Sequence, residues 1–193
     1  EALVAVPYAF KVLSEHLSPE ADRSPAMRAV YGRHLPTLVY ASRPWVVEHL
    51  PVLFPKDDVL RTGTWDGYSY ARHDYSGIYD LLRPLYLAEL DCYSDGNVTE
   101  VAHPDVLTFR DERTRHEVVR LIKQVVLACL LGMDKVEEGS PVGSLVTHPS
   151  VLVRSHAIAQ FAYSLREGWA ERAPQVVTQR AVAFWDQRIA TGR

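Results

Sequence analysis

The sequence has very little cysteine, because only Cys92 and Cys129 occur in 193 residues. Two cysteines without a C-x-x-C spacing cannot form a disulfide framework or a cysteine-rich zinc site. We therefore expect a cytoplasmic protein, with a single disulfide between the two cysteines left open. Long hydrophobic runs are absent too: no stretch approaches the roughly 20 apolar residues of a membrane span, and no signal peptide opens the chain.

The chain also lacks an excess of either charge. Lys and Arg number 21 and Asp and Glu number 24, which gives a net charge of −3. Proteins that bind nucleic acid or an anionic membrane by electrostatics carry a positive field, and this balance supplies none. Hydrophobic residues at 47% and charged residues at 23% are ordinary for a globular protein and exclude a disordered or collagen-like chain. We expect neither a nucleic-acid nor a membrane partner.

Catalytic motifs are missing as well. The sequence contains no GxxxxGK[ST] and no GxGxxG phosphate-binding loop. His116-Glu117 begins like a zinc-binding HExxH motif, but Arg120 stands where the second histidine belongs, and the serine within residues 139–143 is one place too early for GxSxG. None of the eight histidines lies three or four residues from another. We therefore predict no catalytic residue, no metal, no cofactor and no enzymatic activity.

The strongest signal that is present is helical periodicity between Glu117 and Leu131. Apolar residues recur there at i, i+3, i+4, i+7 and i+11, which is one face of an α-helix. Other apolar residues widen this face, so we expect a central and deeply buried helix that ends at Gly132 in a left-handed conformation. The face consists of Val118, Leu121, Ile122, Val125 and Cys129.

The same spacing recurs along the rest of the chain, whereas strand alternation and hairpin turns are almost missing. We therefore predict an all-α fold of about 8–10 short helices, with at most a minor sheet. Loops are expected at Asp91–Val101 and Asp134–Gly143. Besides the central helix, the spacing predicts helices near residues 6–17, 27–38, 46–54, 78–85, 158–165 and 177–189.

Prolines punctuate these helices in two ways. Ser24-Pro25 places a capping residue before a proline at the first helical position. Pro36, Pro51 and Pro84 lie within apolar-periodic stretches, where each should kink or break its helix. Short, kinked helices favour a HEAT-like or TPR-like array over a straight bundle. We expect a single domain with a weak seam at 91–103.

One internal similarity supports an array. In Ser24–Arg28 and in Ser150–Arg154 a serine precedes an arginine by four positions, and an apolar face follows. Two copies establish no repeat period. Either arginine could bind an acidic partner, but we expect each to bond a neighbouring helix end or a carboxylate.

Residues 63–80 are a compositional anomaly, because five of these 18 residues are aromatic against 10% of the whole chain. Exposed Tyr and Trp side chains give a large contact area at low entropy cost, so this cluster is a candidate protein-binding surface. The alternative is a small core in which the rings stabilise the fold. The candidate binding residues are Trp65, Tyr68, Tyr70, Arg72 and Tyr75.

Several stretches carry a family resemblance. They are Tyr31–Tyr40, Trp45–Leu50 with Phe54-Pro55, Trp65 with Tyr68, Leu81–Tyr86, Val153-Arg154 and Ala183–Arg188. Together they resemble the C-terminal helical regions of bacterial STAND-type NTPases and related antiviral defence proteins. In such proteins an effector and an NTPase core precede a repeat-like sensor, so the resemblance implies a sensor role and a bacterial source.

These observations favour a non-catalytic, protein-binding sensor or scaffold domain over residues 1–193. Because the chain begins at Glu1 rather than Met, we expect it to be part of a longer polypeptide. Its expected partners are the rest of that polypeptide and a second protein, which is a phage protein under the defence interpretation. The alternatives are a small-molecule-binding helical domain of a bacterial regulator and an enzyme fragment with an unrecognised site.

Overall fold

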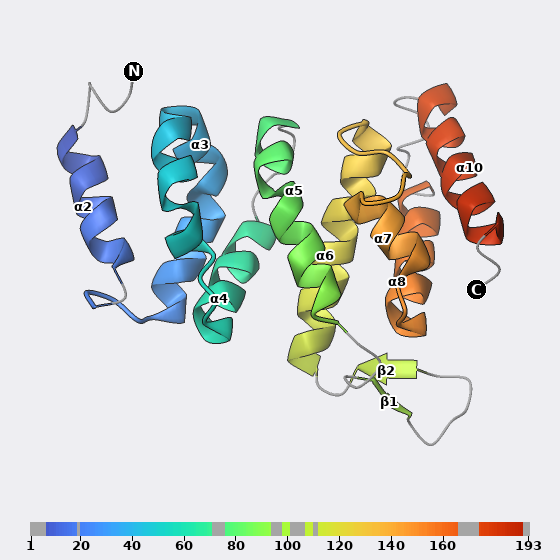
Figure 1. The fold of residues 1–193 in the computed structure, drawn as a ribbon, viewed down its shortest axis with the longest axis horizontal. Helices are drawn as coiled ribbons and strands as arrows, with labels where there is room; N and C mark the ends of the chain where they lie inside the picture. The colour runs from blue at the N-terminus through green and yellow to red at the C-terminus, as the bar shows by residue number, and fades with distance from the viewer. Residues whose placement is uncertain are drawn as a thin grey trace. The chain divides into compact units, whose positions relative to one another are not determined.

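Figure 1 shows the computed structural model, which describes residues 7–18, 20–70, 76–93, 98–100, 107–109, 112–165 and 174–190. Within these residues the chain forms eight helices and one two-stranded ribbon, so the predicted helical fold is confirmed. The chain divides into two compact units, residues 1–78 and 79–193. Tyr86 donates a hydrogen bond to Gln124 at 2.8 Å, which joins the helices on either side of 91–103 within the second unit.

The first unit contains α2 (Pro7–Leu17), α3 (Pro25–Leu53) and α4 (Asp58–Ser69). Pro25 occupies the start of α3 as predicted, but the Ser24 side chain makes no capping bond. Instead the Asp22 carboxylate accepts the backbone N–H of Ser24 at 2.7 Å. At the start of α4 the Asp57 carboxylate accepts the N–H of Leu60 at 3.0 Å, which satisfies one of the donors that a helix start leaves open.

The backbone of α3 leaves the helical conformation at Ser42, where φ is −157° and ψ is 88°. Pro44 explains this break, because its ring clashes with the carbonyl four residues earlier. The Ser42 hydroxyl then accepts a backbone N–H at 3.4 Å and caps the second half of the helix. Pro36, Pro51 and Pro84 do not break their helices, since α3 and α5 (Ser76–Asp91) continue through all three. Tertiary packing here overrides local propensity.

Three glycines bring the backbones of α3 and α4 into contact. A Cβ atom on Gly67 would lie 1.8 Å from the carbonyl oxygen of Ala29, and one on Gly63 would lie 2.6 Å from that of Pro25. A Cβ on Gly32 would lie 2.0 Å from a carbonyl oxygen of α4. Only glycine fits at such distances, so these positions are fixed by close approach. The pair of helices forms the centre of the first unit.

The second unit is built around α6 (Glu112–Leu131), which contacts α7, α8 and α10. All five residues of its predicted apolar face are buried, so the prediction of a central helix is confirmed. Gly132 has φ +80° and donates to Cys129 O at 3.0 Å, while Met133 donates to Ala128 O at 2.8 Å. These two bonds are those of a Schellman C-cap, as the sequence predicted. The other elements are β1 (Val98–Glu100), β2 (Leu107–Phe109), α7 (Pro141–Thr147), α8 (Val151–Ser164) and α10 (Pro174–Ala190).

The two strands pair antiparallel, with Val98 opposite Phe109 and Thr99 opposite Thr108. The sequence assigned 98–100 to a loop, and the structure corrects this assignment. Three residues in a strand are too few to produce a visible alternation of apolar and polar side chains. The second predicted loop ends earlier than expected, because Pro141 already begins α7.

Candidate protein-binding surface

The structure separates the aromatic residues that the sequence grouped together. Trp65 and Tyr68 lie on α4 and are buried, with the Trp65 ring 4.8 Å from Phe54 and 6.0 Å from Tyr68 between centroids. The expectation that these two rings form a recognition surface was therefore wrong. The reason is the glycine contact between α3 and α4, which draws this face of α4 into the core.

Tyr70 differs from its neighbours, because it is 69% exposed just after the end of α4. Arg72 and Tyr75, the other two candidates, lie outside the described residues. The last aromatic residue of the segment, Tyr79, is buried in the second unit. Of the five predicted binding residues, Tyr70 is thus the one that the structure places at the surface.

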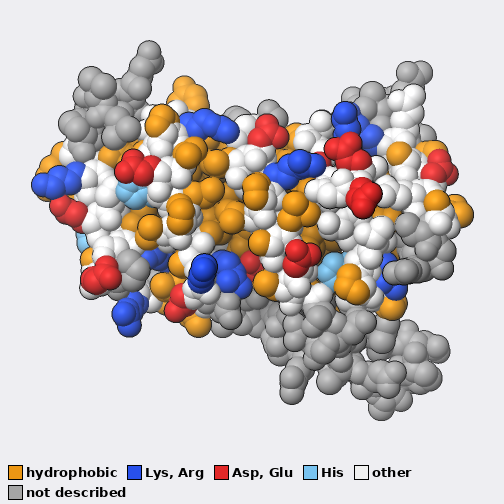
Figure 2. Space-filling model, viewed as in Figure 1, with side chains coloured by type: hydrophobic (Ala, Val, Ile, Leu, Met, Phe, Trp, Pro, Cys, Tyr) orange, Lys and Arg blue, Asp and Glu red, His pale blue; other side chains and the backbone are white. Residues whose placement is uncertain are grey.

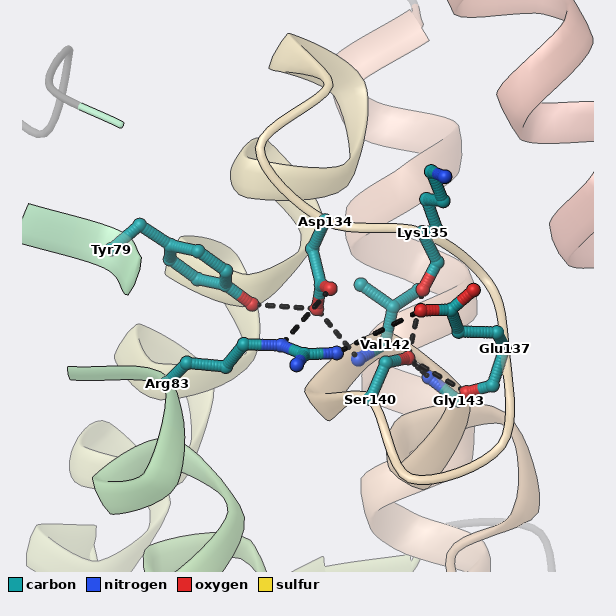
Figure 3. A network of polar contacts seen from close by, with 8 residues as sticks. All are labelled: Tyr79, Arg83, Asp134, Lys135, Glu137, Ser140, Val142 and Gly143. Atoms are coloured by element: carbon teal, nitrogen blue, oxygen red, sulfur yellow. Dashed lines mark hydrogen bonds and ion pairs between the residues drawn. The ribbon is translucent and has the colours of Figure 1, made fainter. Parts of the chain in front are cut away.

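Asp134 is a buried carboxylate at the centre of a polar network in the second unit (Figure 3). Its Oδ2 accepts the Tyr79 hydroxyl at 2.8 Å and the N–H of Val142 at 3.4 Å. Arg83 Nε lies 3.5 Å from Oδ1, and Nη2 of the same guanidinium lies 3.9 Å from Glu137 Oε1. The network therefore ties α5 to the segment between α6 and α7.

Ser140 closes the same segment onto α7 (Figure 3). Its hydroxyl oxygen lies 2.7 Å from Lys135 O and 2.8 Å from Glu137 O, and it accepts the N–H of Gly143 at 2.8 Å. Gly139 supplies the left-handed turn with φ +75°. Ser140 is thus the N-cap of α7, which accounts for its position within this glycine-containing stretch without a GxSxG motif.

Two ionisable groups near Asp134, the Tyr79 phenol and the Cys129 thiol, are held in their protonated forms. Burial, followed by the charge of Asp134, raises the pKa of Tyr79 well above its ordinary value. The same two causes, partly offset by Arg180, raise the pKa of Cys129 to about 12. A neutral thiol and a neutral phenol are poor nucleophiles and bases, so this network is a structural cross-link at neutral pH.

Ser14 and His49 form the kind of contact that nucleophilic catalysis uses, with Ser14 Oγ 3.0 Å from His49 Nε2. The same hydroxyl donates to Phe10 O at 3.0 Å and accepts the indole N–H of Trp45 at 2.9 Å. His49 Nδ1 lies 2.9 Å from Trp45 O, a carbonyl that can only accept, so in a neutral His49 the Nε2 atom and Phe10 O share the one proton of the Ser14 hydroxyl. The cluster joins α2 to α3, and no signal in the sequence pairs residues 35 positions apart.

Arg28 is only 1% exposed and binds two helix ends. Its guanidinium donates to Leu17 O at 2.6 Å and to Val52 O at 2.9 Å, near the C-termini of α2 and α3. A cation is stabilised there by the helix dipole, although burial lowers the pKa of the side chain. Arg154 donates to the carbonyls of His148 and Pro149 before α8. The prediction of a helix-end role is confirmed for Arg28.

The described residues offer few other sites for ligands. No group of three His, Cys, Asp or Glu side chains among them could hold a metal ion. No helix in the described part of the chain is long and apolar enough to cross a membrane. Figure 2 shows acidic and basic side chains interspersed with hydrophobic ones on the described part of the face in view.

The outward face of α3 is the surface that stands out. Four exposed residues follow one another at spacings of 3, 4 and 3 positions on the half of this helix that precedes the break at Ser42. Three of them carry an apolar or methyl-bearing side chain, and Tyr40 is 92% exposed. We call this surface the α3 seam; it consists of Val30, Arg33, Thr37 and Tyr40.

Sequence reasoning missed the α3 seam because α3 has two apolar stripes. The stronger one, with Tyr31 and Leu35, faces the core. The weaker one was visible as a spacing of three and four, but nothing in the sequence says which stripe is covered. Comparisons with known proteins add no assignment, since no family model, curated protein or solved structure matches this chain.

Proposed function

We propose that this chain is a non-catalytic, protein-binding helical domain, the sensor or scaffold part of a larger bacterial antiviral defence protein. The resemblance to the C-terminal regions of STAND-type NTPases suggests the context. Under this proposal the domain is cytoplasmic, its helices form a HEAT-like or TPR-like array, and its partners are a phage protein and the rest of its own polypeptide. It uses no cofactor.

The α3 seam is the observation that carries the proposal. Interface hot spots favour Tyr, Trp and Arg side chains that lie in a mostly apolar surface, and the seam presents Tyr40 and Arg33 in that setting. By contrast, the polar groups of half-buried Ser14 and of buried Asp134 and Arg28 are occupied by partners within the fold. The geometry thus favours surface recognition over chemistry.

The test is a phage-challenge assay on cells that carry the full-length parent protein. We expect the double variant Val30→Ser/Tyr40→Ser to abolish protection, because it removes the two largest apolar side chains of the seam. Its melting temperature should stay close to that of the wild type, since exposed substitutions change stability by only about 0.5 kcal/mol. Tyr70→Ala tests the remaining aromatic candidate in the same assay.

The matched control is Tyr8→Ser on α2. Tyr8 is 77% exposed and lies outside the seam, so this variant should retain protection. Full protection by the Val30→Ser/Tyr40→Ser variant would contradict the proposal. Equal loss in the Tyr8 variant would show that any exposed tyrosine matters and would remove the case for the seam.

A further inference from the structure

We propose that His148 is a pH-sensitive switch, which joins the end of α5 to the start of α8 and releases them when its ring takes up a second proton. His148 is 4% exposed and lies between α7 and α8. Its Nε2 atom lies 3.0 Å from Leu90 O, and its Nδ1 atom accepts the backbone N–H of Ser150 at 3.1 Å. One ring therefore links segments that are 58 residues apart in the sequence.

The two partners of the ring determine where its proton sits. A backbone carbonyl can only accept a hydrogen bond, and a backbone N–H can only donate one. Nε2 must therefore carry a proton for Leu90 O, whereas Nδ1 must keep its lone pair for Ser150. A neutral imidazole with its proton on Nε2 meets both demands. A second proton would go to Nδ1, where it would point at the N–H of Ser150 and break that hydrogen bond.

The start of α8 also disfavours a positive charge on the ring. Ser150 is the N-cap of α8, so the ring lies at the positive end of the helix dipole, which repels a cation. Arg154 donates to the backbone carbonyl of His148 itself, which places a second cation close by. A buried charge is costly unless a group of opposite charge pairs with it.

The ionisable residues around Leu90 do little to offset this cost. Glu89 and Asp91 flank Leu90 at the end of α5, and α7 contains no ionisable residue. Asp91 is exposed and Glu89 is half-buried, so water screens their attraction for a charged ring. Cys92 and Tyr93 come next, and thiols and phenols are uncharged groups below about pH 7.

The number of protons bound in each state gives the direction of the pH effect. In water, histidine takes up its second proton as the pH falls from about 8 to about 5. The unfolded chain binds this proton freely at residue 148, whereas the folded chain binds it only after the contact with Ser150 breaks. The unfolded state therefore binds more protons, so the stability that the contact contributes is present at about pH 8 and is lost as the pH falls.

Hydrogen exchange of the whole chain, followed by mass spectrometry from pH 8 to pH 5, measures the release. After correction for the intrinsic exchange rates, we expect peptides over residues 86–93 and 147–154 to exchange at least about tenfold faster at pH 5 than at pH 7. His148→Asn should remove this pH dependence. The side-chain carbonyl of an asparagine can accept the N–H two residues later, as Nδ1 does here, but it does not titrate.

His156→Asn is the matched control on α8. His156 Nδ1 lies 3.0 Å from Leu152 O, a contact that both the neutral and the charged ring can make, so this variant should keep the pH dependence. An equal pH dependence in the wild type and in His148→Asn would overturn the switch. Loss of the dependence in His156→Asn as well would show that the response does not come from His148.

Nitrogen NMR of the wild-type imidazole rings tests the switch without any substitution, and decides the matter if His148→Asn fails to fold. We expect the His148 ring at pH 7 to carry its proton on Nε2 and to gain a second proton only as the amides of residues 147–154 lose protection. A proton on Nδ1 at pH 7, or a doubly protonated ring with residues 147–154 still protected, would contradict the proposal.

Discussion

Helices α3 and α6 hold their units together by opposite means. α6 is surrounded by large apolar side chains, and five of them recur on one face with helical spacing. α3 instead meets α4 through glycines, at distances that exclude a Cβ atom. The packing around α6 depends on side-chain volume, whereas the close contact of α3 with α4 depends on the absence of side chains at the glycines. A sequence pattern shows a recurring row of apolar side chains far better than it shows a close contact at glycines.

The units also differ in how they bury a charge. Arg28 in the first unit is neutralised by no carboxylate within hydrogen-bonding distance among the described residues; it donates to two helix-end carbonyls. Asp134 in the second unit has a cation, a phenol and a backbone N–H as partners. Both arrangements satisfy the buried group, as burial requires. Arg28 thereby holds the C-terminal ends of α2 and α3 in place, and Asp134 holds the segment between α6 and α7.

The largest effect is expected from a substitution that adds a side chain to α4 at its contact with α3. Gly67→Ala should cost about 4 kcal/mol or more, because the new Cβ would lie 1.8 Å from Ala29 O, a backbone atom that cannot move aside. Urea unfolding followed by the fluorescence of Trp45 and Trp65, both in the first unit, measures the loss.

Gly77→Ala on α5 is the matched control for this variant. A Cβ there would lie 3.2 Å from Nη1 of Arg43, the far end of a flexible side chain. We expect a change within about 1 kcal/mol. If Gly67→Ala and Gly77→Ala lower the free energy of unfolding equally, then α3 and α4 are farther apart than the structure places them.

These contrasts explain how much the sequence could predict. The periodicity predicted α6 and the Gly132 cap, because one face of that helix is uniformly apolar. It missed the contact at Gly67, since a glycine in a sequence does not show what approaches it. It misplaced Trp65 for the same reason. The α3 seam could be predicted only as a spacing, because exposure depends on which neighbours cover the helix.

The second prediction tests how much the packed apolar side chains of α6 contribute to stability. Leu121→Ala should cost about 3 kcal/mol, within the range of about 2–5 kcal/mol for core leucines, because the side chain is buried on α6 and leaves a cavity. Val119→Ala is the control on the same helix, at a half-buried position. A loss below about 0.5 kcal/mol for Leu121→Ala would show that the packed centre of the unit lies elsewhere.

The smallest effect concerns the thiol on the same buried face. The pKa of Cys129 is raised to about 12 in the folded protein, whereas an unfolded thiol loses its proton near pH 9. Above pH 9 the unfolded state therefore binds fewer protons than the folded state, so the free energy of unfolding falls as the pH rises towards 12. At about pH 10 this contribution should amount to about 1.4 kcal/mol.

Urea unfolding of the wild type and of Cys129→Ala, between about pH 8 and pH 10, isolates this contribution from the tyrosines that both proteins share. Cys129→Ala is less stable at pH 8, because it leaves a small cavity. The gap to the wild type should narrow as the pH rises, since only the wild type loses the thiol contribution. Cys92→Ala removes an exposed thiol and should leave the pH dependence unchanged. If the Cys129→Ala and wild-type curves stay parallel, α6 does not hold its thiol in a water-free core, and the contrast with α3 loses its basis.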